Sequence, residues 1–223
     1  MNLTRGWQSL LSLRLVAVGR WEPNPRGRLA KAAFELFAAQ GFDQTTGAQI
    51  AARAGMHERS FFRLFPDKRE VFFHALETAQ REAVTVIAQA PEGTAPVDAV
   101  ATALEERCAV IQQHRAAALT RQRLIAANSE LRERDLTKHA ELAGALAAAL
   151  RERGAPDPAA TLAADIGMAA FRTALSRWND DPEHQDLPAL FRDNLHELAS
   201  MLAHLAQPDP APAVIDRDPL ADS

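Results

Sequence analysis

Residues 45–68 read TTGAQIAARAGMHERSFFRLFPDK, and this stretch predicts two short helices joined by a tight glycine turn. Gly55 stands where the chain must pass through a left-handed conformation, which any Cβ would make costly. Ala51 supplies the small side chain that two crossing helices need where they touch. Apolar residues fall where they would bury the angle between the helices: Ile50, Ala54, Met56, Phe61 and Leu64. The pattern is typical of a helix-turn-helix unit, which lays its second helix in the DNA major groove.

The composition favours an all-helical protein. The chain has 223 residues, 47% of them hydrophobic, and Ala and Leu dominate while Tyr is absent. A single cysteine, Cys108, excludes an internal disulfide framework and favours a reducing cytoplasm. No run of about 18 apolar residues is present, so we expect no membrane span.

Charge is distributed unevenly along the chain. The net charge is −4, but residues 26–69 hold eight basic and four acidic side chains. This segment is therefore net positive and the remainder strongly negative. A basic N-terminal module joined to an acidic body is expected of a DNA-binding domain fused to a domain that does not contact DNA.

The helical period of apolar residues and the Gly and Pro punctuation together predict nine helices. The first begins at Arg26 and ends before Gly41, a helix-stop position. Asp67 is placed to cap the fourth helix, and residues 91–96, PEGTAP, form a linker. The remaining predicted helices span residues 46–54, 58–65, 68–90, 97–113, 115–128, 130–153, 159–178 and 187–206.

Four segments follow from these boundaries. Residues 26–72 form a three-helix DNA-binding domain, and residues 73–206 form a larger helical domain for ligand binding and dimerisation. Residues 207–223, rich in Pro and acids, are expected to be disordered. Residues 1–25 are expected to be a non-essential, disordered extension or the product of a start codon assigned too far upstream. Their apolar run is interrupted by Arg14 and lacks a cleavage site, which argues against a secretion signal.

The segments AAFELFAAQGFDQTT and IAARAGMHERSFFRLFPDK resemble the TetR family of bacterial regulators, over roughly residues 26–73. The flanking GRWEP and ERSFFRLFPDKREV look like an actinobacterial subgroup. The resemblance implies a homodimer, a palindromic operator and a small-molecule pocket in the C-terminal domain. Two departures stand out: family members usually carry Tyr at the position of Phe62 or Leu64, and a larger residue at Gly47. Operator contacts should therefore depend more on cations and main-chain donors.

The second motif helix offers the candidate base-reading residues. Arg59 can grip guanine O6 and N7 together, although it could equally contact only phosphate. Glu58 could accept from cytosine N4, or simply stabilise the helix dipole. Phe62 could pack on a thymine methyl, or belong to the core. Thr46 and Lys68 are expected to meet phosphates on either side of this helix, the alternatives being plain capping and a solvated lysine. The full set of expected DNA-binding residues is Thr46, His57, Glu58, Arg59, Ser60, Phe62, Arg63 and Lys68.

The C-terminal domain carries fewer specific signals. Cys108 reads as a small buried hydrophobe, with redox sensing as the alternative. The histidines show no metal-ligand spacing, so neither a metal nor a cofactor is expected. Candidate pocket residues are Leu104, Cys108, Ile111, Leu124, Met168 and Phe171. The last two helices are expected to pair with their copies in a four-helix bundle, through Phe171, Leu175, Trp178, Leu195, Leu198 and Leu202.

These observations predict a ligand-responsive DNA-binding transcriptional regulator, a repressor that binds a palindromic operator as a dimer and that a small molecule releases. No nucleophile with its base and no paired carboxylates are apparent, so an enzyme is not expected. The alternative is a non-specific architectural DNA-binding protein, but such a protein would be basic throughout and would not carry an acidic domain with its own core.

Overall fold

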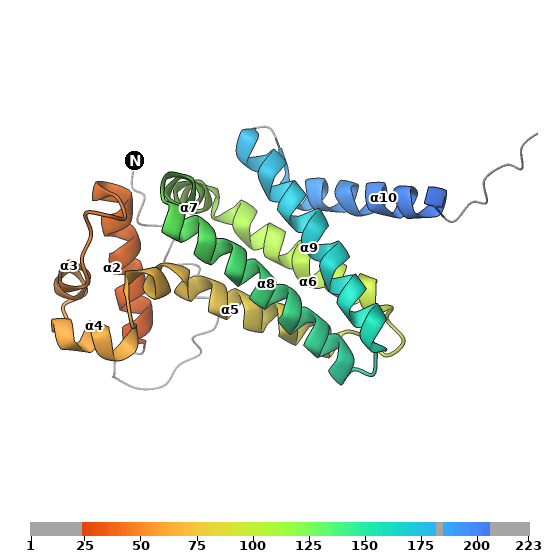
Figure 1. Cartoon of the computed structure of the whole chain (residues 1–223), viewed down its shortest axis with the longest axis horizontal. Helices are drawn as coiled ribbons and strands as arrows, with labels where there is room; N and C mark the ends of the chain where they lie inside the picture. Colours follow the sequence, from red (N-terminus) through yellow and green to blue (C-terminus); the bar gives the residue numbers. More distant parts are fainter. Residues whose placement is uncertain (1–23, 182–184, 206–223) are drawn as a thin grey trace, which may run out of the picture.

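The computed structural model describes residues 24–181 and 185–205, and these residues form nine helices and no strand (Figure 1). The expected N-terminal extension and C-terminal tail lie outside the described residues. The all-helical fold and the helix count predicted above are confirmed for the described part of the chain. The helices are α2 (Pro25–Gln40), α3 (Gly47–Arg53), α4 (Glu58–Leu64), α5 (Lys68–Gln89), α6 (Pro96–Gln113), α7 (Arg115–Ala127), α8 (Ser129–Glu152), α9 (Asp157–Asp180) and α10 (Leu187–Leu205).

Helices α2, α3 and α4 form the N-terminal domain at one end of the molecule (Figure 1). Asn24, with φ 94°, caps α2 by accepting a 2.9 Å hydrogen bond from the Gly27 amide. Gly55 has φ 67° in the turn between α3 and α4, and Ala51 is fully buried at the crossing of these helices. Both residues therefore serve as the sequence predicted. Asp67 caps α5 by accepting from the amides of Arg69 and Glu70.

Aromatic side chains fill the core of the N-terminal domain. Phe37, Phe42 and Phe72 contact one another in tilted and edge-to-face pairs, with ring centroids 5.1–6.3 Å apart. Ile125 of α7 and Leu131 of α8 are buried in the same cluster. The C-terminal domain thus completes the core of the DNA-binding domain, and a division of the chain between residues 72 and 73 cuts across both this cluster and α5.

The C-terminal domain is a bundle in which α5, α6, α8, α9 and α10 share one core. In Figure 1, α5 leaves the N-terminal domain and runs beneath α8 into this bundle. Its core is dominated by Ala and Leu, and Trp178, Phe171 and Phe191 are its largest fully buried side chains. The small residues allow the helices to approach closely, and the aromatic residues fill the space left between them.

Two expectations about α9 need correction. The helix begins at Asp157 rather than near residue 159, because Pro158 lies in its first turn, where proline's missing N–H has no helical partner to lose. Phe171 and Trp178, expected at the dimer interface, are 0% exposed within a single chain. Helices α6, α8 and α10 pack against α9, so these two rings have no surface left for a partner.

No helix among the described residues is long and apolar enough to cross a membrane.

Two glycines in helix interiors offer a matched test of the packing. A Cβ at Gly167 of α9 would lie closer to Val100 Cγ1 than van der Waals contact allows and 3.1 Å from Leu104 Cδ1, whereas a Cβ at Gly144 of α8 would meet nothing within 4 Å. We expect Gly167→Ala to lower the free energy of unfolding by about 1–3 kcal/mol. Gly144→Ala should raise it by about 0.5–1 kcal/mol through helix propensity. Urea unfolding would measure both, and equal effects would contradict the packing described here.

Candidate DNA-binding surface and effector cavity

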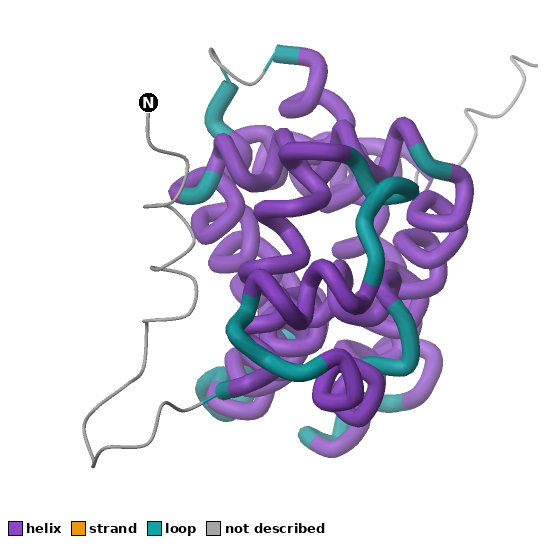
Figure 2. The backbone as a smooth tube through the Cα atoms, turned by 90° about the vertical axis from the view of Figure 1, so that its left-hand side faces the viewer, coloured by secondary structure: helices purple, strands orange, loops and turns teal. Residues whose placement is uncertain are grey.

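Helix α4 presents an exposed face rich in polar and aromatic groups. The N-terminal domain to which it belongs, at the left of Figure 1, is the end of the molecule nearest the viewer in Figure 2. Phe62 is 54% exposed, whereas the neighbouring Phe61 is 0% exposed. The core alternative for Phe62 is therefore wrong, and its ring is available to a ligand. Ser60 is half-buried, and the other exposed candidates on this face are His57, Glu58, Arg59 and Arg63.

Gly47 sets the distance between α3 and α4. A Cβ at this position would lie 2.9 Å from Phe61 Cε1 and 3.2 Å from Phe62 Cζ. The absence of a side chain therefore lets the N-terminus of α3 pack directly on the two rings of α4. Glycine at this position, which departs from the family pattern, thus leaves the room that the rings of Phe61 and Phe62 occupy.

Thr46 caps α3 in a reciprocal arrangement with Gln49. The Gln49 amide donates to Thr46 Oγ1 (3.2 Å), and the Thr46 amide donates to Gln49 Oε1 (2.9 Å), which makes a capping box. Thr46 remains exposed, and its hydroxyl still has a hydrogen to donate. The capping role and a phosphate contact are thus compatible in this geometry.

Lys68 has a different position from the one expected of a phosphate contact. Its Nζ donates to the carbonyl oxygens of Phe42 (2.8 Å), Asp43 (3.2 Å) and Thr45 (3.2 Å), and lies 4.3 Å from the centroid of the Phe42 ring. All three N–H bonds of the ammonium are therefore used inside the chain. Lys68 ties the turn before α3 to the first residue of α5, and so holds the helix-turn-helix in place.

Several other basic residues of the N-terminal domain are also engaged within the chain. Arg53 of α3 pairs with Glu35 of α2 at 2.8 Å, and Arg69 pairs with Asp67 at 2.7 Å. Arg59 and Arg63, by contrast, have no ion-pair or hydrogen-bond partner among the residues that the structure describes. They are exposed cations on α4, available for an external anion.

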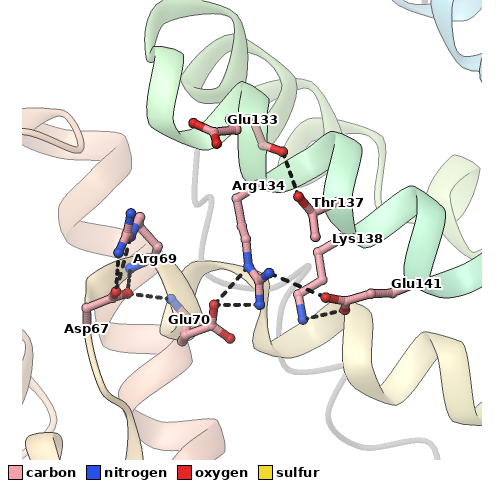
Figure 3. Close-up of polar contacts among 8 residues, drawn as sticks. All are labelled: Asp67, Arg69, Glu70, Glu133, Arg134, Thr137, Lys138 and Glu141. Carbon is pink, nitrogen blue, oxygen red and sulfur yellow. Dashed lines mark hydrogen bonds and ion pairs between the residues drawn. The ribbon is translucent and has the colours of Figure 1, made fainter.

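Polar contacts join the N-terminal domain to α8. Arg134 donates from Nε to Glu70 Oε1 at 2.9 Å in the first turn of α5, and Lys138 pairs with Glu141 beside it (Figure 3). Asn128 at the start of α8 donates to Asp43 at 2.8 Å. A displacement of α8 would therefore move both the turn before α3 and the first turn of α5, the two segments that Lys68 joins.

The candidate pocket residues do not all come together. Leu104, Cys108, Met168 and Phe171 are buried in the C-terminal core, and Ile111 packs against it. Leu124 instead packs against the N-terminal cluster, because α7 turns toward that domain. Burial raises the pKa of the Cys108 thiol to about 12, which removes the thiolate needed for redox chemistry near neutral pH.

A cavity of about 440 Å³ lies between α8 and α9 and is lined by other residues. Small side chains on α8 and α9 form its apolar part, and polar groups stand at both ends. His139 and Arg172 lie toward one end, Arg151 and Thr161 toward the other. The small lining residues are Ala140, Ala143, Gly144, Ala147 and Ala164.

Sequence reasoning also missed a group of buried polar atoms in the C-terminal domain. Seven buried side-chain N and O atoms lack a hydrogen-bond partner among the described residues, and they lie on α6, α7 and α9 or the joint between α6 and α7. They could not be found from spacing, because they come from separate helices and arginines are common on exposed faces. These atoms belong to Arg107, His114, Arg115, Trp178 and Asn179.

Comparisons with known proteins agree with this architecture. Residues 29–75 match the profile of the bacterial regulatory proteins of the tetR family, and residues 94–203 match that of the MftR C-terminal domain. The chain belongs to the TetR family of transcriptional regulators. Within that family, its C-terminal domain is of the MftR type.

One similar protein is the HTH-type transcriptional regulator TcmR of Streptomyces glaucescens, 36% identical over 78 residues. That match covers 35% of this chain and about a third of TcmR (34%).

Two solved structures share the fold along most of the chain. FadR of Thermus thermophilus, a repressor in complex with lauroyl-CoA, has a TM-score of 0.54 at 24% identity and covers 84% of this chain and 98% of its own. The SmeT–triclosan complex has a TM-score of 0.56 at 17% identity, and the match covers 79% of this chain and 90% of the SmeT chain. SmeT is the repressor of a Stenotrophomonas maltophilia multidrug efflux pump.

The position of Lys68 generates a prediction about stability. Lys68→Ala removes the charged donor from three carbonyl oxygens and should lower the free energy of unfolding by about 1–3 kcal/mol. Hydrogen exchange should quicken at residues 42–46. Arg59→Ala, at an exposed and unpaired site, should change stability by less than about 0.5 kcal/mol. A direct phosphate contact would show the reverse pattern: unchanged stability, and a salt dependence of DNA binding flatter by about one unit per subunit.

Proposed function

We propose that this protein is a transcriptional repressor that binds a palindromic operator as a homodimer in the cytoplasm and is released by a small molecule. The observation that carries the proposal is the exposed face of α4, where Arg59, Arg63 and Phe62 are free while neighbouring cations are paired within the chain. A helix with free cations and one exposed aromatic ring on a rigid support suits the major groove of DNA.

Each exposed group on α4 has a distinct role in this proposal. Arg59 near the helix N-terminus reads a guanine, and Phe62 packs on a thymine methyl group. Arg63, His57, Glu58 and Ser60 complete the contact surface. Thr46 donates its hydroxyl to a phosphate, and Lys68 acts indirectly by holding the turn that carries Thr46.

The proposed dimer uses the outer face of α10. Met201 is 54% exposed and Leu202 50% exposed, although both are large apolar residues on a regular helix. Leu195 and Leu198 pack partly against the core, about two turns and one turn before them respectively. Such an uncovered apolar stripe on the last helix fits a bundle made with a second copy, and Leu175, 9% exposed, adds little to it.

Effector control requires a path from the C-terminal domain to α4. Arg121 of α7 supplies part of it: its guanidinium pairs with Asp135 of α8 at 2.9 Å and lies 5.4 and 5.1 Å from the rings of Phe72 and Phe73 in α5. A ligand that prefers one arrangement of α7 and α8 would thereby shift α5 and change the distance between the two α4 helices of the dimer. Ligands seen in FadR and SmeT make a small-molecule effector a natural expectation here.

The DNA-reading role of Arg59 is tested by comparing specific with non-specific binding. Arg59→Ala should cost about 1–3 kcal/mol per half-site on the operator and relax the preference at one base pair, with little effect on random DNA. Two half-sites should be separated by about 34–36 Å or a multiple of it.

Fluorescence anisotropy with operator and scrambled duplexes at several salt concentrations would measure these effects. Arg123→Ala, an exposed arginine on α7, is the matched control and should leave both affinities unchanged. Equal losses on operator and scrambled DNA would make Arg59 a backbone contact. A wild-type protein that binds all duplexes alike would instead support an architectural role.

The dimer proposal is tested at Leu202. Leu202→Glu places a charge in the proposed seam and should convert a dimer to a monomer at micromolar concentration in sedimentation velocity. Leu136→Glu, at a site on α8 that is 68% exposed, should remain dimeric. A wild-type monomer at this concentration, or a Leu202→Glu dimer, would refute the proposed interface.

A further inference from the structure

Arg107 of α6 places a guanidinium inside the C-terminal domain without a partner. Its Nε and Nη1 atoms are closed off from solvent and make no hydrogen bond with any described residue. Its guanidinium carbon lies 5.6 Å from the centroid of the Phe171 ring. The aromatic ring attracts the charge but offers no hydrogen-bond acceptor oxygen, so Nε and Nη1 remain unsatisfied.

The surroundings of Arg107 hold too little negative charge to balance it. Two acids act on Arg107 electrostatically: Glu82 is exposed to solvent, and Asp135 already pairs with Arg121 at 2.9 Å and lies 3.9 Å from His139. Burial, and then the charge of Arg121, lower the pKa of Arg107 to about 10, so the guanidinium still carries its proton at neutral pH. Two partly buried guanidiniums thus share the carboxylate of Asp135, and Arg107 has no ion-pair partner of its own among the described residues.

His139 lies beside the same Phe171 ring that Arg107 contacts, and it faces the cavity between α8 and α9. The imidazole meets the Phe171 ring edge-on at 6.3 Å, and it also lines the cavity. Burial, opposed by Asp135 and reinforced by Arg121, Arg107 and Arg172, lowers the pKa of His139. The ring is therefore neutral at neutral pH, and it can donate one N–H to an anion without adding charge.

The cavity itself has two kinds of lining. Alanine and glycine residues line most of this channel between its polar ends, Asp165 of α9 also lines it, and its volume is about 440 Å³. Residues 136 and 151 of α8 both contribute, which gives the channel a length of about 22 Å along the helix at 1.5 Å per residue. The polar end with His139 and Arg172 is the end that adjoins Arg107.

Buried N–H groups of a charged side chain are costly without an acceptor, and a ligand that brings an anion to them removes that cost. We propose that Arg107 is the counterion of an organic carboxylate effector, whose head group lies between Arg107 and His139 and whose apolar body occupies the cavity between α8 and α9. The planar guanidinium presents two adjacent N–H groups, which match the two oxygens of a carboxylate. This inference rests on the proposed effector control and names the chemical class of the effector.

The position of the head group also explains how binding would reach the DNA. Arg107 and Arg121 act on each other electrostatically, and Arg121 holds Asp135 and the two rings of α5. A carboxylate beside Arg107 offers Arg121 a second anion. The pair between Arg121 and Asp135, which joins α7 to α8 next to α5, is thereby weakened.

The test uses the full-length protein and two matched pairs of probes, octanoate with octan-1-ol and benzoate with benzyl alcohol. Isothermal titration calorimetry should show at least one carboxylate binding more tightly than its neutral counterpart. Arg107→Met should lower the affinity for that carboxylate roughly ten- to a hundredfold and change the affinity for the matching alcohol by less than about twofold. Arg107→Lys should retain part of the preference, and the exposed-site control Arg123→Met all of it.

A second measurement without any ligand separates a binding role from a structural one. Because Arg107 lacks a counterion in the free protein, Arg107→Met should unfold at the same or a higher temperature than the wild type. A clear fall in the unfolding temperature would make the guanidinium a structural group and overturn the proposal. So would equal affinities for both members of each probe pair, or an Arg107→Met protein that keeps the carboxylate preference.

Operator binding, measured separately by anisotropy, keeps this inference distinct from the proposed function. A protein that binds operator but prefers no carboxylate refutes the inference alone. A protein that binds the carboxylate through Arg107 but no specific DNA supports the inference about the site and refutes the repressor role.

Discussion

The three hydrogen bonds from Lys68 to the carbonyl oxygens of Phe42, Asp43 and Thr45 are the contact on which the N-terminal domain depends. They join the turn before α3 to the first residue of α5, where Asp67 also caps the helix. The helix-turn-helix has only two seven-residue helices, too short to be stable alone. Its orientation is therefore set by α5, and any movement of α5 moves the DNA-reading face of α4.

Because α5 belongs to both cores, the two domains cannot move independently. Phe72 and Phe73 are buried in the N-terminal cluster, whereas Ala83 and Ile87 of the same helix are buried in the C-terminal one. Ile125 and Leu131, at the end of α7 and the start of α8, close the N-terminal cluster from the other side. Apolar packing and the Arg134–Glu70 and Asn128–Asp43 bonds thus converge on one corner, which is where a signal from the C-terminal domain must pass.

The C-terminal domain combines a tightly packed apolar core with an unusual set of buried polar groups. Gly167 packs against Val100 and Leu104 with no room for a methyl group, and Trp178 and Phe171 are fully enclosed. A few residues away, Arg107 and Arg115 carry N–H groups that no described residue satisfies. Native proteins leave few such groups, and a functional role is one explanation for those that remain. The same helices that form the rigid core therefore also form the part of the domain best suited to hold a charged ligand.

The sequence by itself determined the helices and the reading motif, because these depend on local chemistry. Gly55, Ala51 and Asp67 could be assigned from turn, crossing and capping rules that involve only nearby residues. Tertiary structure decided the role of each exposed or buried polar group. Lys68 looked like a solvated or phosphate-binding cation until the turn 26 residues away brought three carbonyl oxygens to it, and Phe171 and Trp178 looked like interface residues until α6 and α10 covered them. Arg107, Arg121, Asp135 and His139 come from three separate helices, so no sequence spacing marks them as neighbours. Burial and pairing depend on which distant segments fold together, and local sequence patterns do not record that.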